Sequence, residues 1–253
     1  MKALFINLDR EETRRAFQMS QAVDLGLDLQ RIPAVKGDEV TPPPEAPYWQ
    51  RWQRPLRLAE MATLMSHRIA WQHVLQAQVP CLILEDDAWL MPSCKEFLVG
   101  IATLQGIDHL SLETRNRFKI LGQPHPLNSG IRRLFLDRTG AAAYVLWPTG
   151  ARKLLARVDV TPGLADAVLM ETPRLQSWQA VPAYAIQIDI AAHYGLTPPI
   201  QVSSSISDTA RPDQVTLPFR MRRMRENLRL LTRMFPLVFG AKREKVSLSI
   251  TNS

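Results

Sequence analysis

The sequence predicts a three-layer α/β/α domain built on a mixed, mostly parallel β-sheet, followed by a basic helical extension. Strand-like apolar runs alternate with helix-like segments through residues 1–190, which indicates an α/β fold. The continuously apolar run 81–84 is typical of a strand buried within a parallel sheet. From residue 219 onward, arginines alternate with apolar residues at helical spacing, which indicates a separate helix. We therefore expect one domain over 1–215 and an extension over 216–253.

The expected strands are short apolar runs bounded by polar, glycine or proline residues. In chain order they lie at 2–7, 29–35, 81–84, 109–112, 118–121, 141–147 and 184–190. The expected helices repeat apolar residues every three or four positions, as Leu58, Met61, Met65, Ile69 and Val74 do. They lie at 11–25, 58–76, 93–104, 150–158 and 165–172.

Glycine and proline indicate where these elements stop. Gly26 is expected to end the first helix, and Gly37 to turn the chain after the second strand. Residues 41–55 hold five prolines together with Tyr48, Trp49 and Trp52, so they are expected to form a loop. Its aromatic side chains either contact a ligand or pack on the domain.

Length and composition indicate a globular protein. A chain of 253 residues can bury a full core, and a hydrophobic content of 46% is ordinary. No segment approaches the roughly 18 consecutive apolar residues that a membrane-spanning helix needs. The N-terminus becomes polar too early for a signal peptide, and Cys81 and Cys94 make no disulfide framework. We therefore expect a cytoplasmic protein.

The net charge of +7 lies in one segment. Residues 220–245 carry nine Lys/Arg and two acidic residues, which equals the net charge of the whole chain. The remainder is neutral, so no nucleic-acid-binding core is expected. In 219–245, apolar residues such as Met224, Leu228 and Phe235 recur on one helix face and arginines fill the other. This helix is expected either to hold the protein on the anionic inner face of the cytoplasmic membrane, or to pack on the domain with its arginines in water.

Three consecutive carboxylates, Glu85, Asp86 and Asp87, follow the apolar run 81–84. Like charges at the end of a buried strand cost free energy unless a cation or hydrogen bonds compensate them. In open α/β sheets the carboxyl ends of strands form the crevice where ligands bind. Hard divalent cations often combine one or two protein carboxylates with substrate phosphates. The residues therefore indicate a metal–diphosphate site; the alternative is a solvated acidic turn that caps the next helix.

Several stretches, taken in order, resemble glycosyltransferase family 25, the lipooligosaccharide/lipopolysaccharide galactosyltransferase-like group. They are FINLDR at 5–10 with Arg14 or Arg15 behind it, RIPAVKG at 31–37, Glu60 with Ser66-His67 and Trp71, LILEDD at 82–87, and RTGAAAYV at 138–145 followed by Gly150-Ala151. The sequence departs from the family pattern at Ala62-Thr63, at Ala141 and in the Gly-Leu-Ala-Asp context of Asp166.

This resemblance implies a GT-A-like domain that moves a hexose from a UDP-sugar, UDP-galactose or a related UDP-hexose, to a saccharide acceptor in lipopolysaccharide or lipooligosaccharide biosynthesis. It also implies a divalent metal, Mn²⁺ or Mg²⁺, which would neutralise the charge that develops on the departing UDP. If the reaction inverts the anomeric centre, a carboxylate must accept the proton of the acceptor hydroxyl.

The resemblance and the residue chemistry together suggest roles for individual side chains. Asp87 is the first expected metal ligand and Asp86 the next, although Asp86 could hold the donor instead; His193 is a candidate third ligand. Asp166 is the expected base, with Glu113 as its competitor. The other donor-binding candidates are Asn7, Arg14, Glu60, Ser66, His67 and Glu85. For His67 the alternative role is a core hydrogen bond, and for Arg14 a surface ion pair.

Two other classes of function fit parts of the sequence. A carboxylate-metal phosphotransferase or nuclease also uses aspartates at strand ends, but it leaves Glu60 and Ser66-His67 without a role. A non-catalytic saccharide-binding relative would explain the substitutions Ala62-Thr63, but it does not explain why the acidic triplet is present.

Overall fold

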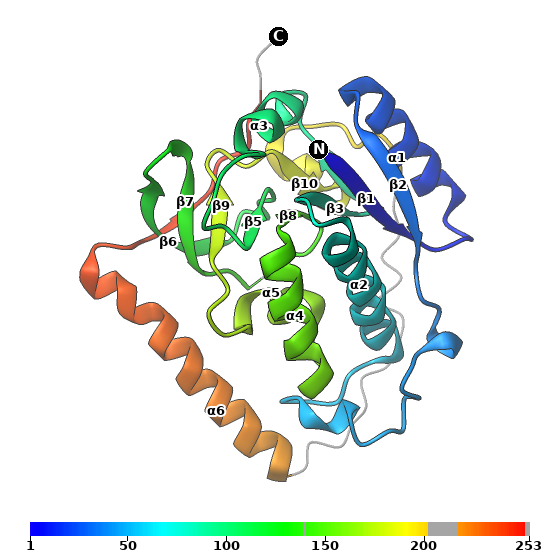
Figure 1. Ribbon diagram of the computed structural model, residues 1–253, viewed down its shortest axis with the longest axis vertical. Helices are drawn as coiled ribbons and strands as arrows, with labels where there is room; N and C mark the ends of the chain where they lie inside the picture. Colours follow the sequence, from blue (N-terminus) through cyan, green and yellow to red (C-terminus); the bar gives the residue numbers. More distant parts are fainter. Residues whose placement is uncertain (139, 202–216, 251–253) are drawn as a thin grey trace.

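The computed structural model describes residues 1–138, 140–201 and 217–250, and within them the chain forms one large mixed sheet (Figure 1). This sheet has nine strands in the order β11-β6-β7-β9-β5-β8-β3-β1-β2, and β4 and β10 form a second, two-stranded sheet. The strands are β1 (Lys2–Asn7), β2 (Asp28–Pro33), β3 (Cys81–Glu85), β4 (Ala88–Leu90), β5 (His109–Ser111), β6 (Phe118–His125), β7 (Asn128–Leu136), β8 (Ala143–Leu146), β9 (Ser177–Ala180), β10 (Ala185–Gln187) and β11 (Lys242–Lys245).

Strand directions in the large sheet bring the acidic triplet to the edge where parallel strands end. β1 pairs in parallel with both β2 and β3, and β5 pairs in parallel with β9. β8 is antiparallel to both β3 and β5, and the β7, β6 and β11 pairings are also antiparallel. Because β1, β2 and β3 share one direction, their carboxyl ends meet at the edge where ligands bind in open α/β sheets.

Helices cover both faces of the sheet, as predicted for a three-layer domain. Helices α2 (Leu58–Ala77), α4 (Pro148–Val160) and α5 (Ala165–Glu171) lie on one face, and α1 (Glu12–Leu25) and α3 (Cys94–Ile101) lie on the other (Figure 1). Side chains alternate accordingly: Leu4 and Ile83 pack in the first core, and Phe5 and Leu84 pack in the second. A strand buried on both faces has no polar side, which explains the unbroken apolar run of β3.

Two local predictions are confirmed. Gly26 ends α1 in the left-handed conformation with φ 56°, and its backbone N–H bonds to carbonyls of the last turn. The proline-rich loop packs on the domain: Trp49 and Trp52 are buried, and the Tyr48 hydroxyl donates to the carbonyl of Val158 at 2.5 Å. The loop also contains a single 3₁₀ turn, Trp49–Arg51.

The C-terminal part differs from the expected continuous helical pattern. The helix α6 spans Leu217–Met234 and is followed by a 3₁₀ segment, Phe235–Phe239. Pro236 lacks the N–H that would continue the helix, and Gly240 turns the chain with φ 86°. Residues 242–245 then form β11, which pairs with β6 at the edge of the large sheet. Among the helices described, none is both long and apolar enough to cross a membrane.

Candidate active site

The acidic triplet occupies the tight turn between β3 and β4, and α1 holds the backbone of this turn. Gln18 is fully buried, and its side-chain amide donates to the carbonyls of Ala88 at 2.7 Å and Asp86 at 3.2 Å. Gln21 accepts from the backbone N–H of Leu90 at 2.7 Å. Buried carbonyls in a turn need such partners, so the two glutamines fix the position of the carboxylates.

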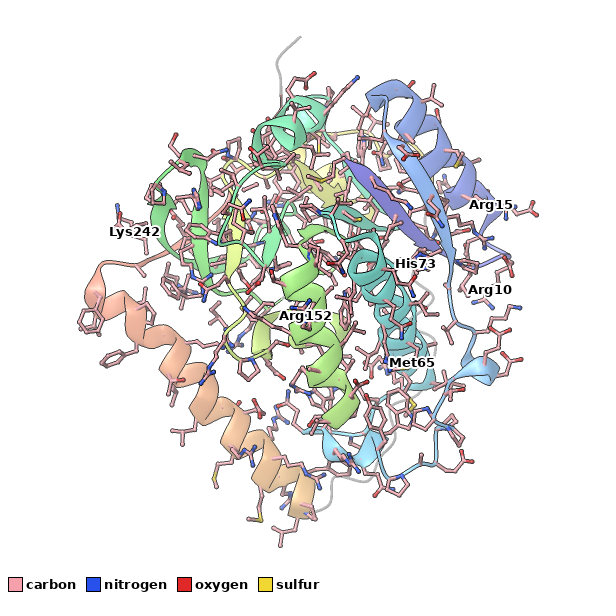
Figure 2. The ribbon with its side chains drawn as sticks, in the orientation of Figure 1. Arg10, Arg15, Met65, His73, Arg152 and Lys242 are labelled. Carbon is pink, nitrogen blue, oxygen red and sulfur yellow. The ribbon has the colours of Figure 1, made fainter. Side chains whose placement is uncertain are left out.

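Asp86 is held from the end of β1 and from α1. Its Oδ2 accepts from the amide of Asn7 at 2.8 Å, and its Oδ1 pairs with Arg14 at 3.0 Å. Arg31 donates to the Asn7 side-chain oxygen at 3.1 Å, which leaves the Asn7 NH₂ group directed at Asp86. The structure thus selects Arg14 over Arg15, which projects outward at the edge of the molecule and lies 3.7 Å from Glu12 (Figure 2).

Glu85 is tied to α2 and β8 by a chain of hydrogen bonds. Trp71 Nε1 donates to the Tyr144 hydroxyl at 2.7 Å, and this hydroxyl lies 2.9 Å from His67 Nδ1. His67 Nε2 lies 3.2 Å from Glu85 Oε1; because an ionised carboxylate can only accept, Nε2 then carries the proton and Nδ1 accepts from Tyr144. Burial lowers the pKa of His67 to about 4, so the imidazole is neutral near pH 7.

Asp87 faces Gln187, the last residue of β10. Gln187 Nε2 lies 3.3 Å from Asp87 Oδ2 and 3.4 Å from Glu85 Oε2, so one amide bridges two carboxylates. The backbone N–H of Ile188 donates to the Asp87 carbonyl at 3.0 Å, which anchors the end of β10 beside the triplet. Gln187 could not be predicted from the sequence, because a glutamine at the end of a short strand carries no motif.

The site holds more negative charge than its contacts neutralise. Burial, and next the neighbouring Asp86, raise the pKa of Glu85 to about 7. Burial, Glu85 and Asp86 likewise raise the pKa of Asp87 to about 7. Burial raises the pKa of Asp86 against the opposing effect of Asn7 and Arg14. Raised carboxylate pKa values of this kind indicate a place where a bound cation would lower the free energy.

Two further carboxylates interact with this cluster, one partly accessible and one buried. Asp166 lies in the first turn of α5 and accepts from the backbone N–H of Ala167 at 2.7 Å. Burial raises its pKa to about 6, and its charge in turn helps to raise the pKa of Glu85. Glu113 is 1% exposed, accepts from the backbone N–H of Ala142 at 2.8 Å, and has a pKa raised by burial to about 8.

Comparison with known proteins identifies the family. A family model described as glycosyltransferase family 25 (LPS biosynthesis protein) matches residues 1–170. The chain belongs to this family. Membership of a glycosyltransferase family argues against a phosphotransferase or nuclease. No curated protein matches the chain.

Solved structures match only distantly. A mannose-1-phosphate geranyltransferase from Thermus thermophilus is 11% identical, with a TM-score of 0.36, over 72% of this chain and 59% of that one. The chain therefore spans 59% of that protein's length. A mutant of the Drosophila β-1,4-galactosyltransferase 7 in complex with manganese, UDP-Gal and xylobiose is 10% identical, with a TM-score of 0.40, over 85% and 81% of the two chains.

The residues that carry the family 25 resemblance come together only in part. Asn7, Arg14, His67, Glu85, Asp86 and Asp87 are joined by the contacts described above. Ser66 is buried and bonds within the domain, accepting from the Val35 N–H at 2.9 Å. Glu60 pairs with Arg54 at 2.8 Å and accepts from the Arg57 N–H, also at 2.8 Å, as the capping residue of α2.

The predicted third metal ligand is corrected. His193 is exposed in the 3₁₀ segment Ile188–Tyr194 and stacks edge-on against Tyr194. Within the part of the chain that the structure describes, no three His, Cys, Asp or Glu side chains are grouped to hold a metal ion. His193 therefore does not join Asp86 and Asp87 in one ligand set. The strand expected over 184–190 ends at Gln187, and the 3₁₀ segment that follows it carries His193.

Proposed function

We propose that this family 25 protein transfers a hexose from a UDP-sugar, with UDP-galactose as the first donor to test, to a saccharide acceptor of lipopolysaccharide or lipooligosaccharide. The observation that carries the proposal is the half-buried cluster of Glu85, Asp86 and Asp87 at the carboxyl end of β3, with pKa values raised by burial and, for Glu85 and Asp87, by mutual repulsion. A diphosphate brings its own negative charge, so it can bind beside these carboxylates only together with a divalent cation.

Asp87 is the residue that we propose holds the cation, as Mn²⁺ or Mg²⁺. Its carboxylate is contacted by the neutral amide of Gln187 at 3.3 Å, whereas both oxygens of Asp86 are engaged by Asn7 and Arg14. Hard oxygen ligands suit both ions, and two or fewer protein carboxylates suffice when phosphate oxygens complete the coordination. When bound, the cation would stabilise the negative charge that develops on the departing nucleoside diphosphate.

Asp166 is the general base that we propose for an inverting reaction. Its pKa of about 6 places it mostly ionised at neutral pH, where a base must be able to accept a proton. Glu113 is less suited, because it is 1% exposed and its pKa of about 8 keeps it protonated at neutral pH. The partly accessible carboxylate is the one that an acceptor hydroxyl can reach.

Contact with an anionic lipid surface through α6 is the last part of the proposal. The apolar stripe of α6 does not pack on the domain: Met221, Met224, Leu228 and Leu231 are 60–70% exposed, and Phe235 beyond the helix is 61% exposed. Exposed arginines lie on the same helix. An outward apolar stripe with flanking basic residues is suited to lie in the interface of a membrane that contains anionic lipids.

The test compares Asp87→Asn with Asp24→Asn, a matched control because Asp24 is exposed on α1 away from the triplet. Wild-type protein and Asp24→Asn should hydrolyse or transfer from a UDP-hexose only when Mn²⁺ or Mg²⁺ is added. Asp87→Asn should lose at least about a hundredfold in metal-dependent turnover while keeping its circular dichroism spectrum. Full metal-dependent turnover by Asp87→Asn would contradict the assignment, and folded wild-type protein that neither binds nor turns over any nucleotide sugar would favour a non-catalytic relative.

A further inference from the structure

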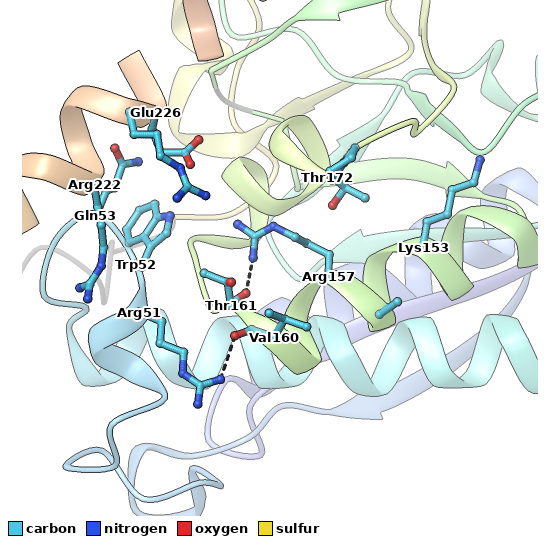
Figure 3. A pocket seen from close by; sticks show the side chains of 13 residues that line it. Arg51, Trp52, Gln53, Lys153, Arg157, Val160, Thr161, Thr172, Arg222 and Glu226 are labelled. Carbon is cyan, nitrogen blue, oxygen red and sulfur yellow. Dashed lines mark hydrogen bonds between the residues drawn. The ribbon is translucent and has the colours of Figure 1, made fainter. Parts of the chain in front are cut away.

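A cavity of about 500 Å³ lies between the proline-rich loop, α4 and the first half of α6 (Figure 3). It is separate from the acidic triplet, whose three carboxylates do not line it. Its walls include Arg51, Trp52 and Gln53 of the loop, Arg157 of α4, and Arg222 and Arg225 of α6. Because α6 lies outside residues 1–170, one wall is formed by a part of the chain that the family model does not match.

The lining of this cavity holds more positive than negative side chains. Four arginines, Lys153 and one carboxylate, Glu226, line it, and Lys153 is paired with Asp108 at 2.5 Å. Arg51 donates to the backbone carbonyl of Val160 at 3.1 Å, and Arg222 donates to the carbonyl of Gln50. Carbonyl partners orient a guanidinium without neutralising its charge. The positive potential of the cavity is therefore available to an anionic ligand.

Arg157 adds a cation that is held in place from two directions. It donates to the carbonyl of Thr161 and lies 3.7 Å from Glu171. Burial raises the pKa of Glu171 to about 7, so this carboxyl is only partly ionised at neutral pH and offsets less charge. Figure 3 shows Arg51, Arg157 and Arg222 on three different segments around the cavity. Guanidinium groups are common protein ligands of phosphate.

The size and the other lining groups suit a saccharide that carries the phosphate. A volume of about 500 Å³ is in the range of small-molecule sites. Thr161 and Gln53 supply polar groups, and Trp52 with Val160 supplies apolar surface. A site for free phosphate alone would need neither this space nor this surface.

The cavity adjoins the side of the active site that holds Asp166. The Arg54 guanidinium lies 5.0 Å from the centre of the Trp52 ring. Burial raises the pKa of Asp166, and the positive charge of Arg54 partly opposes that rise. Gly163, which precedes α5, also lies against Trp52: a Cβ there would lie 3.3 Å from Trp52 Nε1. Trp52, which lines the cavity, thus lies against both Arg54, whose charge acts on the proposed base, and Gly163 before α5.

We propose that this cavity binds the phosphate group of a phosphorylated saccharide, and that it serves as an acceptor subsite. The acceptor role rests on the proposed function, whereas binding of the phosphate rests only on the charges and contacts of the cavity. Arg222 and Arg225 of α6 would bind the phosphate together with Arg51 and Arg157.

The experiment measures binding by calorimetry, without donor or metal, to glucose 1-phosphate, glucose and inorganic phosphate. The pocket variant is Arg222→Gln with Arg225→Gln; the matched control is Arg220→Gln with Arg223→Gln, which removes the same charge from exposed positions of α6 outside the cavity. Wild-type protein should bind glucose 1-phosphate more tightly than inorganic phosphate, and glucose least. The pocket variant should weaken glucose 1-phosphate binding at least about tenfold, and the control less than about twofold.

Equal weakening by both variants, or equal binding of glucose and glucose 1-phosphate, would overturn the proposal. Tight binding of inorganic phosphate with no gain from the sugar would limit the cavity to a free-phosphate site and would overturn the saccharide part. Asp87→Asn separates this inference from the proposed function, because it should bind glucose 1-phosphate as the wild type does. A further outcome is that nucleotide sugars do not bind, although the pocket variant weakens glucose 1-phosphate binding and Asp87→Asn does not. That outcome would support the anion site and contradict the proposed reaction.

Discussion

His67 Nε2 donates a hydrogen bond to Glu85 Oε1 at 3.2 Å, and this contact joins the middle of α2 to the end of β3. His67 is completely buried and its pKa of about 4 keeps it neutral, so its role is to orient a carboxylate and not to titrate near neutral pH. Behind it, the other ring nitrogen accepts from the Tyr144 hydroxyl. The acidic triplet is thus positioned from the core outward.

Removing the Tyr144 hydroxyl should disturb both stability and turnover. Tyr144→Phe leaves the buried Trp71 Nε1 and His67 Nδ1 without their partner, and each unsatisfied group costs about 1–3 kcal/mol. Urea unfolding should show that loss, and kcat should fall with little change in KM because His67, which orients Glu85, loses its own partner. The control is Tyr48→Phe, which removes a hydroxyl bonded to the Val158 carbonyl elsewhere; an equal loss of kcat in the control would contradict the role of Tyr144.

The pH profile should report Asp166. Burial raises its pKa to about 6, and a base must be ionised, so kcat/KM should rise as the pH rises through about 6 and then level off. Asp166→Asn should lower kcat/KM at least about a hundredfold and remove this acidic limb. Initial rates between pH 5 and 8 test this. If Asp166→Asn keeps the same fall of kcat/KM at low pH, that fall belongs to the titration of another group.

Metal binding should stabilise the protein most at alkaline pH. Glu85 and Asp87 have folded pKa values of about 7, above the ordinary 4.5 and 3.8, so their contribution to stability is present below about pH 4 and is lost as the pH rises through about 7. A divalent cation competes with those protons. Thermal unfolding should therefore show a larger Tm increase with Mn²⁺ at pH 8 than at pH 5. The difference should vanish in Asp87→Asn and persist in Asp24→Asn.

A buried ion pair next to β6 should be costly to break from one side. Lys119 is 1% exposed, and its Nζ lies 2.6 Å from Asp137 Oδ2 and 2.6 Å from Gln179 Oε1. Lys119→Met removes the cation that pairs with Asp137 in the core and should cost about 3–5 kcal/mol in the free energy of unfolding. Adding Asp137→Leu should recover most of that loss. Failure of the double variant to recover stability would mean that Lys119 acts mainly through its other contacts.

The exposed stripe of α6 should be required for contact with lipid. Leu228→Glu together with Leu231→Glu should lower binding to vesicles that contain anionic lipid at least about tenfold, because each substitution removes an apolar side chain worth about 1–3 kcal/mol when buried. Val23→Glu on α1, where Val23 is 78% exposed, is the matched control. Co-sedimentation measures both. If the α6 variant and the Val23→Glu control bind the vesicles equally well, α6 does not contact the lipid.

Much of the fold could be predicted because its signals are local. The apolar run of β3, the stripe of α2 and the Gly26 stop lie in the residues that form them, and all three are confirmed. β7 and β9 were missed because their alternation is interrupted by polar and charged side chains. Arg133 of β7 makes contacts across the sheet, where its guanidinium lies 5.7 Å from the Trp178 ring of β9 and donates to the Ser177 carbonyl at 2.8 Å.

The amino-acid sequence by itself determined most of the elements, the family and the acidic triplet, because apolar periodicity and consecutive carboxylates are properties of neighbouring residues. Only the tertiary structure decided which groups meet that triplet. Gln187 lies 100 residues from Asp87, and Tyr144 lies 77 from His67. It also decided that the apolar stripe of α6 faces outward. These relations depend on how helices and strands pack across the sheet, and no pattern within a single segment encodes them.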